Sequence, residues 1–304
     1  MRKGAFALGS IPILLVMGTL PLYSSDYVIS IGLNILMWVA LTESWIILSG
    51  YTGYISLGHA TFYGIGGYMM AISWQSLPFP VAVIMGGLGS LAVALAIGFP
   101  CLRVRGPYFV ILTLGLSEFT KYLFINWEVN VTGTVGRLLM GAPDIKTLYY
   151  SILVIALVTV AVAYVIKRSR FGLALFSIKE NEDAAESLGI HTSLYKWLAF
   201  GISALFPGFV GAIMALRSTY IDPYTVFDPF VSFQVIIMAF LGGYEDVLGP
   251  LLGALILTLL SEVLWARYPY YYTIILGVIL ILIIKFLPSG LIEPLRRFTA
   301  LSRA

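Results

Sequence analysis

Ten apolar stretches, most of them close to 20 residues long, follow one another along this chain and constrain its fold more than any other feature. An α-helix of about 20 residues crosses the ~30 Å hydrocarbon core of a membrane. Because 60% of the residues are hydrophobic and 11% are charged, against roughly 25% charged in soluble domains, a water-soluble globular enzyme is excluded. The stretches predict an all-α polytopic membrane protein in which residues 1–304 form one transmembrane domain.

About ten transmembrane helices are predicted. The eighth stretch is short enough for a re-entrant segment, so the predicted count is eight to ten. The first stretch is predicted to stay as a helix and not to be a cleaved signal peptide, because it is long enough to span and more apolar stretches follow at once. The predicted helices cover residues 4–23, 27–48, 54–74, 81–100, 108–127, 147–166, 197–216, 229–243, 248–265 and 270–287.

The distribution of lysine and arginine predicts the orientation, because loops rich in these residues stay in the cytoplasm. With both termini inside, five of the 18 basic residues fall outside and the other thirteen inside. We therefore predict that both termini are cytoplasmic. The outer loop 128–146 has the glycines and proline of a turn-rich loop. The five outer residues are Lys121, Arg137, Lys146, Arg217 and Arg267.

Metal-binding and catalytic side chains are scarce. Cys101 is the single cysteine, and His59 and His191 are the two histidines, so the sequence predicts no internal disulfide, no metal site and no histidine-based catalysis. A membrane enzyme would need acids or histidines that converge at one depth, and none do. The Gly-(four residues)-Gly-Lys-Ser/Thr loop that binds ATP phosphates is absent from the sequence. The net charge of +3 gives no reason to predict a nucleic-acid partner.

The loop 167–196 is the longest predicted cytoplasmic segment and has nine charged residues. Within it, residues 179–190 predict a short helix, because acidic residues favour the positive N-terminal end of a helix and Gly189 suits a left-handed stop. Ala184, Ala185 and Leu188 are expected on one side, where small side chains would let the helix enter a groove of another protein. The alternatives are a helix on the lipid headgroups, which an anionic leaflet would repel, or a solvated loop.

Five motifs, taken together, resemble one family. Asp183-Ala184-Ala185, three residues and Gly189 resemble the Glu-Ala-Ala-(three)-Gly signature of ABC-importer permeases, with Asp183 in the place of Glu. As a set in this order, the motifs resemble the permeases of branched-chain amino acid ABC importers, the LivM type, from about residue 50 to 290. The other motifs are Gly50-Tyr-Thr-Gly53 with ISLGHATFYGIGGY (55–68), RVRGPYFVILTLG (103–115), RSRFG (168–172) and LGGYEDVLGP (241–250).

The resemblance implies a half-transporter in the cytoplasmic (inner) membrane of a bacterium or archaeon. It would pair with a second, related permease; two cytoplasmic ATPase subunits would bind ATP and Mg; and an extracytoplasmic binding protein would deliver the substrate. This chain would bind no cofactor and would be surrounded by membrane lipid. Residues 179–189 would be the coupling helix, seated in a cleft of one ATPase. The residues expected to couple are Arg170, Gly172, Glu182, Asp183, Ala184, Ala185, Leu188 and Gly189.

Residues 50–68 contain six glycines, too many for an ordinary stable helix. Either small residues let this segment pack closely against neighbouring helices, which is the favoured interpretation, or the helix is broken and its free backbone groups line a cavity. Residues 241–250 predict a tight cytoplasmic turn between the eighth and ninth helices. Gly249 and Gly253 in this region predict a helix contact.

Six residues are candidates for the substrate path, because an amino-acid zwitterion needs polar groups along its route through a membrane. Each also has a structural interpretation: Glu43 would extend to the interface, His59 would be a hydrogen-bonded packing residue, and Glu118 would pair with Lys121 one turn away. Thr113 and Gln234 would form hydrogen bonds to their own helix or to a neighbouring one. The six are Glu43, Gly58, His59, Thr113, Glu118 and Gln234.

We expect a permease subunit of an ATP-driven importer that moves branched-chain amino acids into the cytoplasm by alternating access, with energy from separate ATPase subunits. One alternative is a related permease for urea or short amides, whose sequences have similar motifs. The other is an ion-gradient-driven carrier that acts alone. Such a carrier would need intramembrane acids that face a cavity and a twofold repeat, and no repeat is obvious in the sequence.

Overall fold

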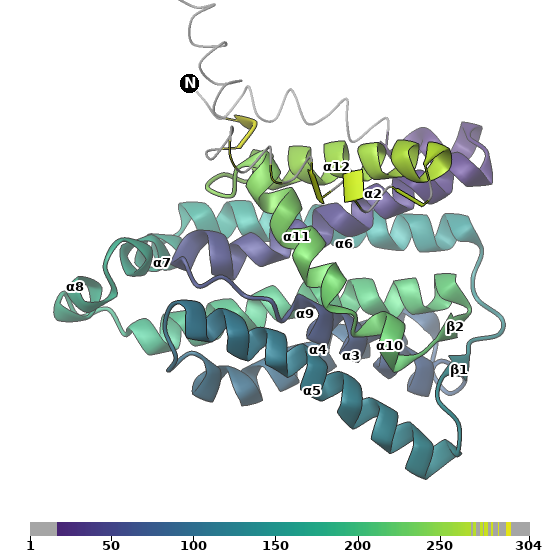
Figure 1. The fold of residues 1–304 in the computed structure, drawn as a ribbon, viewed down its shortest axis with the longest axis horizontal. Coiled ribbons are helices and arrows are strands. Elements are labelled where there is room, and N and C mark those ends of the chain that lie inside the picture. The colour runs from purple at the N-terminus through teal and green to yellow at the C-terminus, as the bar shows by residue number, and fades with distance from the viewer. Residues whose placement is uncertain are drawn as a thin grey trace, which may run out of the picture.

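The computed structural model describes residues 17–268 and, beyond them, residues 270–271, 274–275, 277–278, 281, 285 and 290–292. The described part is helical apart from its connections and two short strands (Figure 1). In chain order, the elements are α2 (Asp26–Trp45), the π-helix η1 (Ile46–Gly50), α3 (His59–Ser73), α4 (Phe79–Cys101), α5 (Pro107–Thr132), β1 (Arg137–Leu138), α6 (Ile145–Arg168), α7 (Arg170–Glu180), α8 (Glu182–Ser187), α9 (Thr192–Ser218), β2 (Tyr220–Ile221), α10 (Pro223–Val226), α11 (Pro229–Gly242) and α12 (Leu248–Arg267).

Seven segments in the described part are long and apolar enough to cross a membrane, which agrees with an all-α polytopic membrane protein. They match seven of the ten predicted helices, including the short eighth one, which α10 extends at its start. The predicted helices 4–23 and 270–287 lie largely outside the described residues, so the full count stays a prediction. The seven are Asp26–Gly50, Phe79–Cys101, Pro107–Thr132, Ile145–Arg168, Thr192–Ser218, Pro223–Gly242 and Leu248–Arg267.

The prediction of a continuous helix over residues 54–74 is wrong. Residues 53–58 are not helical, and α3 begins only at His59. The helix that precedes this break ends in a π-helical turn, and Gly53 then adopts a φ of 76°, a left-handed conformation that glycine reaches at little cost. With 15 residues, α3 is shorter than the ~20 residues of a full membrane span.

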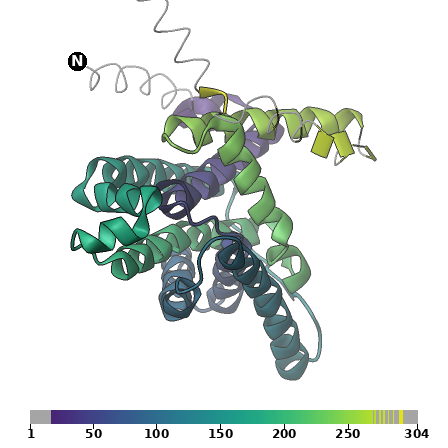
Figure 2. The same cartoon turned by 60° about the vertical axis from the view of Figure 1, so that its left-hand side comes forward.

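α9 forms the centre of the bundle, where it packs against α2, α3, α4 and α6 (Figures 1 and 2). Glycines bring α3 and α9 into backbone contact. A Cβ atom added to Gly66 would lie 2.0 Å from the carbonyl oxygen of Gly208, and one added to Gly211 would lie 1.9 Å from that of Tyr63. The predicted close packing of the glycine-rich segment is therefore confirmed for its helical part.

α11 and α12 are joined by the predicted tight turn, and glycines again bring the two helices together. A Cβ atom on Gly253 would lie 1.9 Å from the carbonyl oxygen of Met238, and one on Gly242 would lie 1.7 Å from that of Gly249. The predicted helix contact of Gly249 and Gly253 is therefore confirmed.

At the end of the bundle opposite α8 (Figure 1), β1 and β2 form an antiparallel ribbon in which Arg137 pairs with Ile221. Glu128, near the end of α5, is fully buried; its carboxylate accepts from Arg137 Nε at 3.0 Å and from the backbone N–H of Gly136 at 2.7 Å. These contacts tie the predicted turn-rich loop 128–146 to the connection between α9 and α10.

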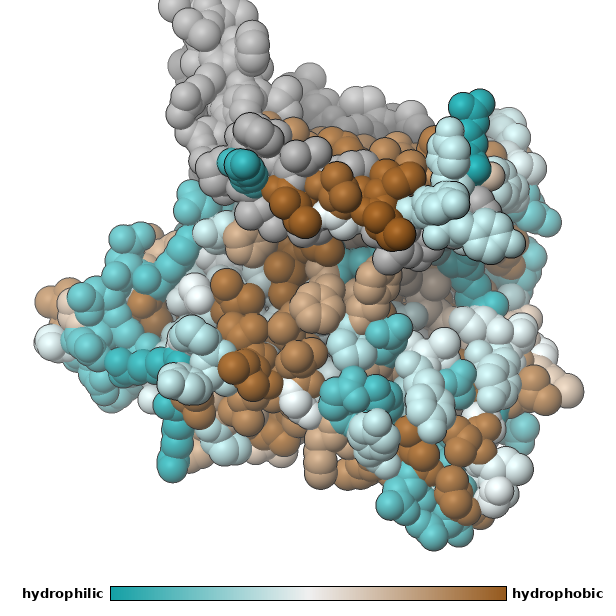
Figure 3. All heavy atoms as spheres, viewed as in Figure 1, coloured by the Kyte–Doolittle hydropathy of each residue, from teal (hydrophilic) through white to brown (hydrophobic). Residues whose placement is uncertain are grey.

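Large apolar side chains are exposed on the helices that surround this core, and Figure 3 shows them gathered over the middle of the molecule, with polar residues around α8. Soluble monomers rarely expose so much contiguous apolar surface. Hydrocarbon is the solvent that suits this surface, which agrees with a multi-pass membrane protein. Examples are Ile84, Leu88, Phe119, Leu123 and Val154.

Candidate functional site

The corner between α6 and α7 lies at the start of the loop 167–196, which is predicted to be cytoplasmic, and depends on Ser169 and Gly172. The Ser169 hydroxyl accepts from the backbone N–H of Gly172 at 3.1 Å and so caps α7. A Cβ atom on Gly172 would lie 2.0 Å from the carbonyl oxygen of Ile166, so this corner needs glycine. Arg170, between them, is exposed. Arg170 and Gly172 are both predicted to couple to an ATPase. Gly172 shapes the corner of the loop, and Arg170 faces outward.

α8 is a separate helix, so the prediction of one helix over residues 179–189 is wrong in its first residues. Asn181 is extended with a φ of −162°, and its side-chain oxygen accepts from the backbone N–H of Ala184 at 3.0 Å. This local bond starts a new helix in place of a continuation of α7. The predicted acidic first turn is present, and Gly189 has the left-handed φ of 86° expected of a stop.

The two alanines of α8 lie on different faces, which corrects the expectation that Ala184, Ala185 and Leu188 share one side. Ala185 is buried, with 2% of its surface exposed. Ala184 is exposed, and Leu188, one turn later, is 83% exposed. Asp183 is exposed as well. The outward face of α8 therefore presents a small residue, a leucine and a carboxylate, while Ala185 seats the helix against its own chain.

Glu182 points toward the membrane-spanning helices. Its carboxylate accepts from Lys196 Nζ of α9 at 2.6 Å and from the Tyr54 hydroxyl at 2.5 Å. Lys196 is 3% exposed and also donates to the Tyr54 hydroxyl at 2.9 Å. Burial alone would raise the pKa of Glu182, but the hydrogen bonds from Lys196 and Tyr54 hold it below its usual value. Glu182 therefore remains charged at neutral pH and anchors α8 to the bundle.

Further ion pairs join the loops at this end of the molecule. Arg105, between α4 and α5, contacts Asp183 at 3.0 Å. Lys167 Nζ lies 2.8 Å from Asp246 Oδ1, and Lys179 Nζ lies 3.3 Å from Glu245 Oε1. The turn between α11 and α12 thus lies at the same end as loop 167–196, as the predicted topology requires.

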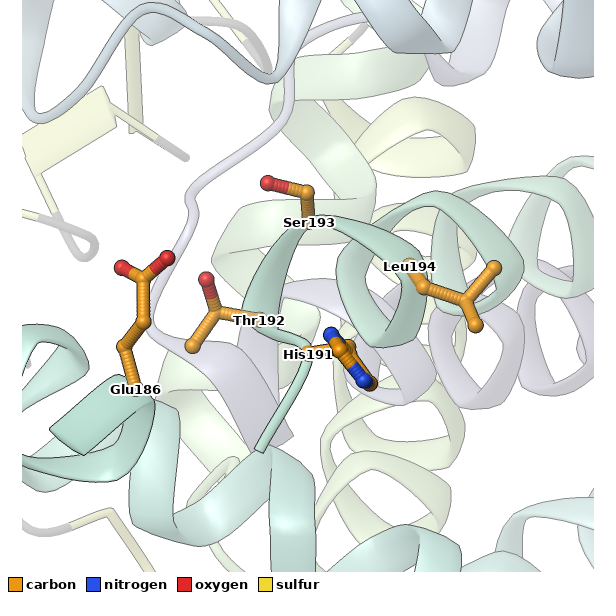
Figure 4. A pocket seen from close by; sticks show the side chains of 5 residues that line it. All are labelled: Glu186, His191, Thr192, Ser193 and Leu194. Atoms are coloured by element: carbon orange, nitrogen blue, oxygen red, sulfur yellow. The ribbon is translucent and has the colours of Figure 1, made fainter. Parts of the chain in front are cut away.

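A pocket of about 390 Å³ lies between α8 and the start of α9. Figure 4 shows Glu186 from α8 on one side of it and Thr192, at the start of α9, on the other. His191, Ser193 and Leu194 complete the lining. The pocket therefore adjoins α8, at the end of the bundle that is predicted to be cytoplasmic.

Hydroxyl side chains satisfy the backbone of the non-helical segment 53–58 and the start of α3. Thr113 of α5 accepts from the backbone N–H of Leu57 at 2.9 Å, and Ser117 of α5 donates to the carbonyl oxygen of Leu57 at 3.3 Å. Ser232 of α11 accepts from the backbone N–H of Ala60 at 2.9 Å. The helix is therefore broken over residues 53–58, and the backbone groups of Leu57 meet side chains of α5. That free backbone groups of this segment line a cavity stays a prediction.

Three of the candidate path residues lie together at this break. Gly58 ends it, His59 begins α3, and a Cβ atom on Gly58 would lie 3.6 Å from the Thr113 Cβ. His59 is 1% exposed, and its Nε2 lies 3.3 Å from the Ser44 hydroxyl. One ring nitrogen of this histidine thus has the contact that a packing role predicts, while its Nδ1 is buried and has no hydrogen-bond partner among the described residues.

The other three candidates lie elsewhere. Glu43 of α2 is fully buried and neither carboxylate oxygen has a hydrogen-bond partner, so the expectation that it extends to the interface is wrong. Glu118 forms the expected ion pair with Lys121, at 2.6 Å. Gln234 is half-buried on α11.

Several residues in these sites escaped the sequence analysis. Ser117 had a weak signal, since Thr113, Ser117 and Thr120 recur at helical spacing in an otherwise apolar stretch. Ser232 is not part of this pattern. Tyr54 and Lys196 had none, because they meet Glu182 only in the folded chain.

Comparison with known proteins gives the family. The model of a family described as branched-chain amino acid transport system / permease component matches residues 27–284. The high-affinity branched-chain amino acid transport system permease protein LivM of Salmonella typhimurium is 28% identical over 88% of this chain and 68% of its own length. LivM of Escherichia coli is 27% identical over 91% of this chain and 72% of its own length.

A permease named for another substrate is also similar. The xylose transport system permease protein XylH of Haemophilus influenzae is 25% identical over 74% of this chain and 61% of its own length. No solved structure matches this chain. Since the family model covers most of the residues, the chain belongs to the family of branched-chain amino acid transport system permease components.

Proposed function

We propose that this chain is one of two permeases in an ABC importer that moves branched-chain amino acids into the cytoplasm. The likeness to two LivM proteins along most of the chain supports the substrate class. Two separate cytoplasmic ATPase subunits would hold ATP and Mg, a second related permease would complete the passage, and an extracytoplasmic protein would deliver the substrate. The chain itself would bind no cofactor, and both of its termini would lie in the cytoplasm of a bacterium or archaeon.

The observation that carries this proposal is the position of α8. It stands at one end of the bundle (Figure 1), with Ala184 and Leu188 outward and Glu182 bonded inward to α9. An exposed leucine with acidic neighbours suits a small apolar contact inside a polar rim, as in protein interfaces. α8 would be the coupling helix, seated in a cleft of one ATPase, and the pocket beside it would belong to the same interface.

The contacts of α8 suggest how force reaches the membrane. A displacement of α8 by the ATPases would act through Glu182 on Lys196, at the start of the central helix α9, and on Tyr54, in the non-helical segment before α3. Asp183 would act on Arg105, just before α5. Two-state movement of these elements would provide alternating access, because a packed bundle switches between discrete arrangements.

Co-purification tests the coupling helix. A tagged chain should retain two ATPase subunits and a second permease. Ala184→Trp should release an ATPase, because the larger ring would separate α8 from its cleft, while the permease pair survives. Leu138→Trp, at an exposed position on β1 at the opposite end, is the control. Retention of both ATPases by Ala184→Trp would overturn this role of α8.

Transport assays test the substrate and the energy source. Proteoliposomes with the complete complex should take up leucine and valine when ATP is supplied to the ATPases, and unlabelled urea should not compete. Competition by urea and not by valine would favour the urea or short-amide alternative. Uptake by this chain alone, driven by an ion gradient, would overturn the importer proposal.

A further inference from the structure

The ion pair of Glu118 and Lys121 lies in the middle of α5. α5 has 26 residues, which gives a length of about 39 Å, and both charges lie more than ten residues from either end of the helix. Apolar side chains precede and follow them, and α5 is one of the segments long enough to span a membrane. We therefore place the pair near the centre of the bilayer, which replaces the predicted position of Lys121 on the outer side.

Glu118 is only partly covered by the rest of this chain, whereas most of the Lys121 side chain is covered. The Glu118 side chain is 40% exposed, and Lys121 Nζ contacts its carboxylate at 2.6 Å with 14% of the lysine side chain exposed. α5 stands at the edge of the bundle in both ribbon views (Figures 1 and 2). A carboxylate in contact with hydrocarbon at mid-depth is costly, and ionisable residues at that depth almost always face other protein or water. Lipid therefore does not suit the surface around Glu118.

The surface beside Glu118 also leaves room for a small molecule. Gly115 lies one helical turn before Glu118, and nothing in the described structure lies within 4 Å of where its Cβ atom would be. The residues that α5 buries are mostly polar, Thr113, Ser117 and Thr120 among them. The strip of α5 around Glu118 thus has one ion pair and an open position at Gly115 between apolar residues such as Ile111 and Ile125. The inner side of the same helix contacts the non-helical segment 53–58.

We propose that Glu118 and Lys121 form a site for the two charges of an amino-acid zwitterion during passage, an inference that rests on the proposed function. In the empty state the two side chains neutralise each other. When the substrate arrives, its ammonium group would pair with the Glu118 carboxylate and its carboxylate with the Lys121 ammonium. The exchange replaces one ion pair by two, so no charge is left uncompensated at mid-depth. No covalent bond or proton transfer is needed.

Cysteine accessibility tests whether this strip borders the passage. In a Cys101→Ala background, Ile111→Cys and Ile125→Cys would place a thiol two turns before and after Glu118, on the same face. Leu112→Cys and Leu123→Cys, which lie about 120° or more around the helix, are matched controls. The probe is a charged, water-soluble methanethiosulfonate applied to the complete complex in proteoliposomes.

We expect labelling at positions 111 and 125 to be about tenfold or more faster than at 112 and 123, because the thiolate forms in water and not in lipid. Addition of leucine together with the binding protein should slow the labelling at positions 111 and 125. Equally slow labelling at all four positions would mean that lipid or tightly packed protein covers the strip, and would overturn the proposal. The comparison of labelling rates between the two pairs of positions, made without leucine, does not depend on which solute the complex transports. It can therefore fail independently of the proposed substrate.

Charge variants test whether Glu118 and Lys121 pair with the two charges of the substrate. Glu118→Gln, Lys121→Gln and the double variant should assemble and hydrolyse ATP, but leucine uptake should fall about tenfold or more in each, as for the loss of a charged hydrogen bond. A purely structural pair would be tolerated in the neutral double variant, so normal uptake by Glu118→Gln/Lys121→Gln would overturn the site while leaving the proposed function intact. If the unmodified complex takes up no branched-chain amino acid, the proposed function fails instead.

Discussion

Among single residues, Lys196 shows best what the sequence could and could not predict. Its side chain is 3% exposed and bonds to Glu182 and Tyr54. Tyr54 and Lys196 are 142 positions apart, and no local pattern links them. The stop of α8 at Gly189, in contrast, could be predicted, because a left-handed glycine acts on backbone within a few residues. Its predicted start lies three residues too early, because the Asn181 side chain caps a new helix there.

Lys196→Met should lower the free energy of unfolding by about 3 kcal/mol, because Glu182 would lose its buried partner and would keep only the more exposed Arg105, at 3.5 Å, to balance its charge. The double variant Lys196→Met/Glu182→Met should recover part of the loss. Thermal unfolding of the purified protein in detergent measures both. Equal stability of Lys196→Met and the unmodified protein would contradict a structural role for this pair.

The stability that Glu182 contributes should depend on pH. Because its pKa is lowered in the folded protein, the contribution is complete above the ordinary carboxyl pKa and is lost as the pH falls through the lowered value. The difference in melting temperature between the unmodified protein and Glu182→Gln should therefore be larger at pH 7 than near pH 4. A difference that grows on acidification would show that the carboxylate is not stabilised by its partners.

Among the elements, α3 with the segment before it combines the two structures that the sequence left as alternatives. The glycines of α3 meet the backbone of α9, while residues 53–58 are unwound and bonded to α5. The glycine content indicates either close helix packing or an unwound segment. Which of the two occurs at a given residue depends on the helix that contacts it. Thr113 and Ser117 lie 56 and 60 positions from Leu57, so the break in the helix could not be located from local sequence.

Two adjacent glycines in α3 should respond differently to alanine. A Cβ atom on Gly66 would lie 2.0 Å from the carbonyl oxygen of Gly208, whereas one on Gly67 would have its nearest neighbour at 3.5 Å. Gly66→Ala should push α3 from α9 and cost about 1–3 kcal/mol through overpacking. Gly67→Ala should be neutral or should stabilise by up to about 1 kcal/mol through helix propensity. Thermal unfolding compares the two, and equal losses would be inconsistent with the described contact.

For the whole molecule, the fold class and the grouping of charged loops could be predicted, because both depend on composition and on the order of apolar stretches. Lys167, Lys179 and Lys196, all predicted on the cytoplasmic side, meet acidic partners at one end of the bundle. The partners themselves could not be predicted. They come from α8 and from the turn after α11, and their positions depend on how the helices pack.

Under the proposed coupling role of α8, this grouping makes Glu182 the position where we expect leucine uptake to be separable from ATP hydrolysis. Glu182→Gln keeps the size of the side chain but removes the charge that Lys196 meets, so α8 should still bind its ATPase through Ala184 and Leu188. We expect ATP hydrolysis by the complete complex to continue while leucine uptake per ATP falls about tenfold, as for a lost charged hydrogen bond. Uptake and hydrolysis are measured in the same proteoliposomes. Glu180→Gln, an exposed change of the same kind at the end of α7, should leave the ratio unchanged. An unchanged ratio in Glu182→Gln would mean that force enters the membrane through other contacts of the loop.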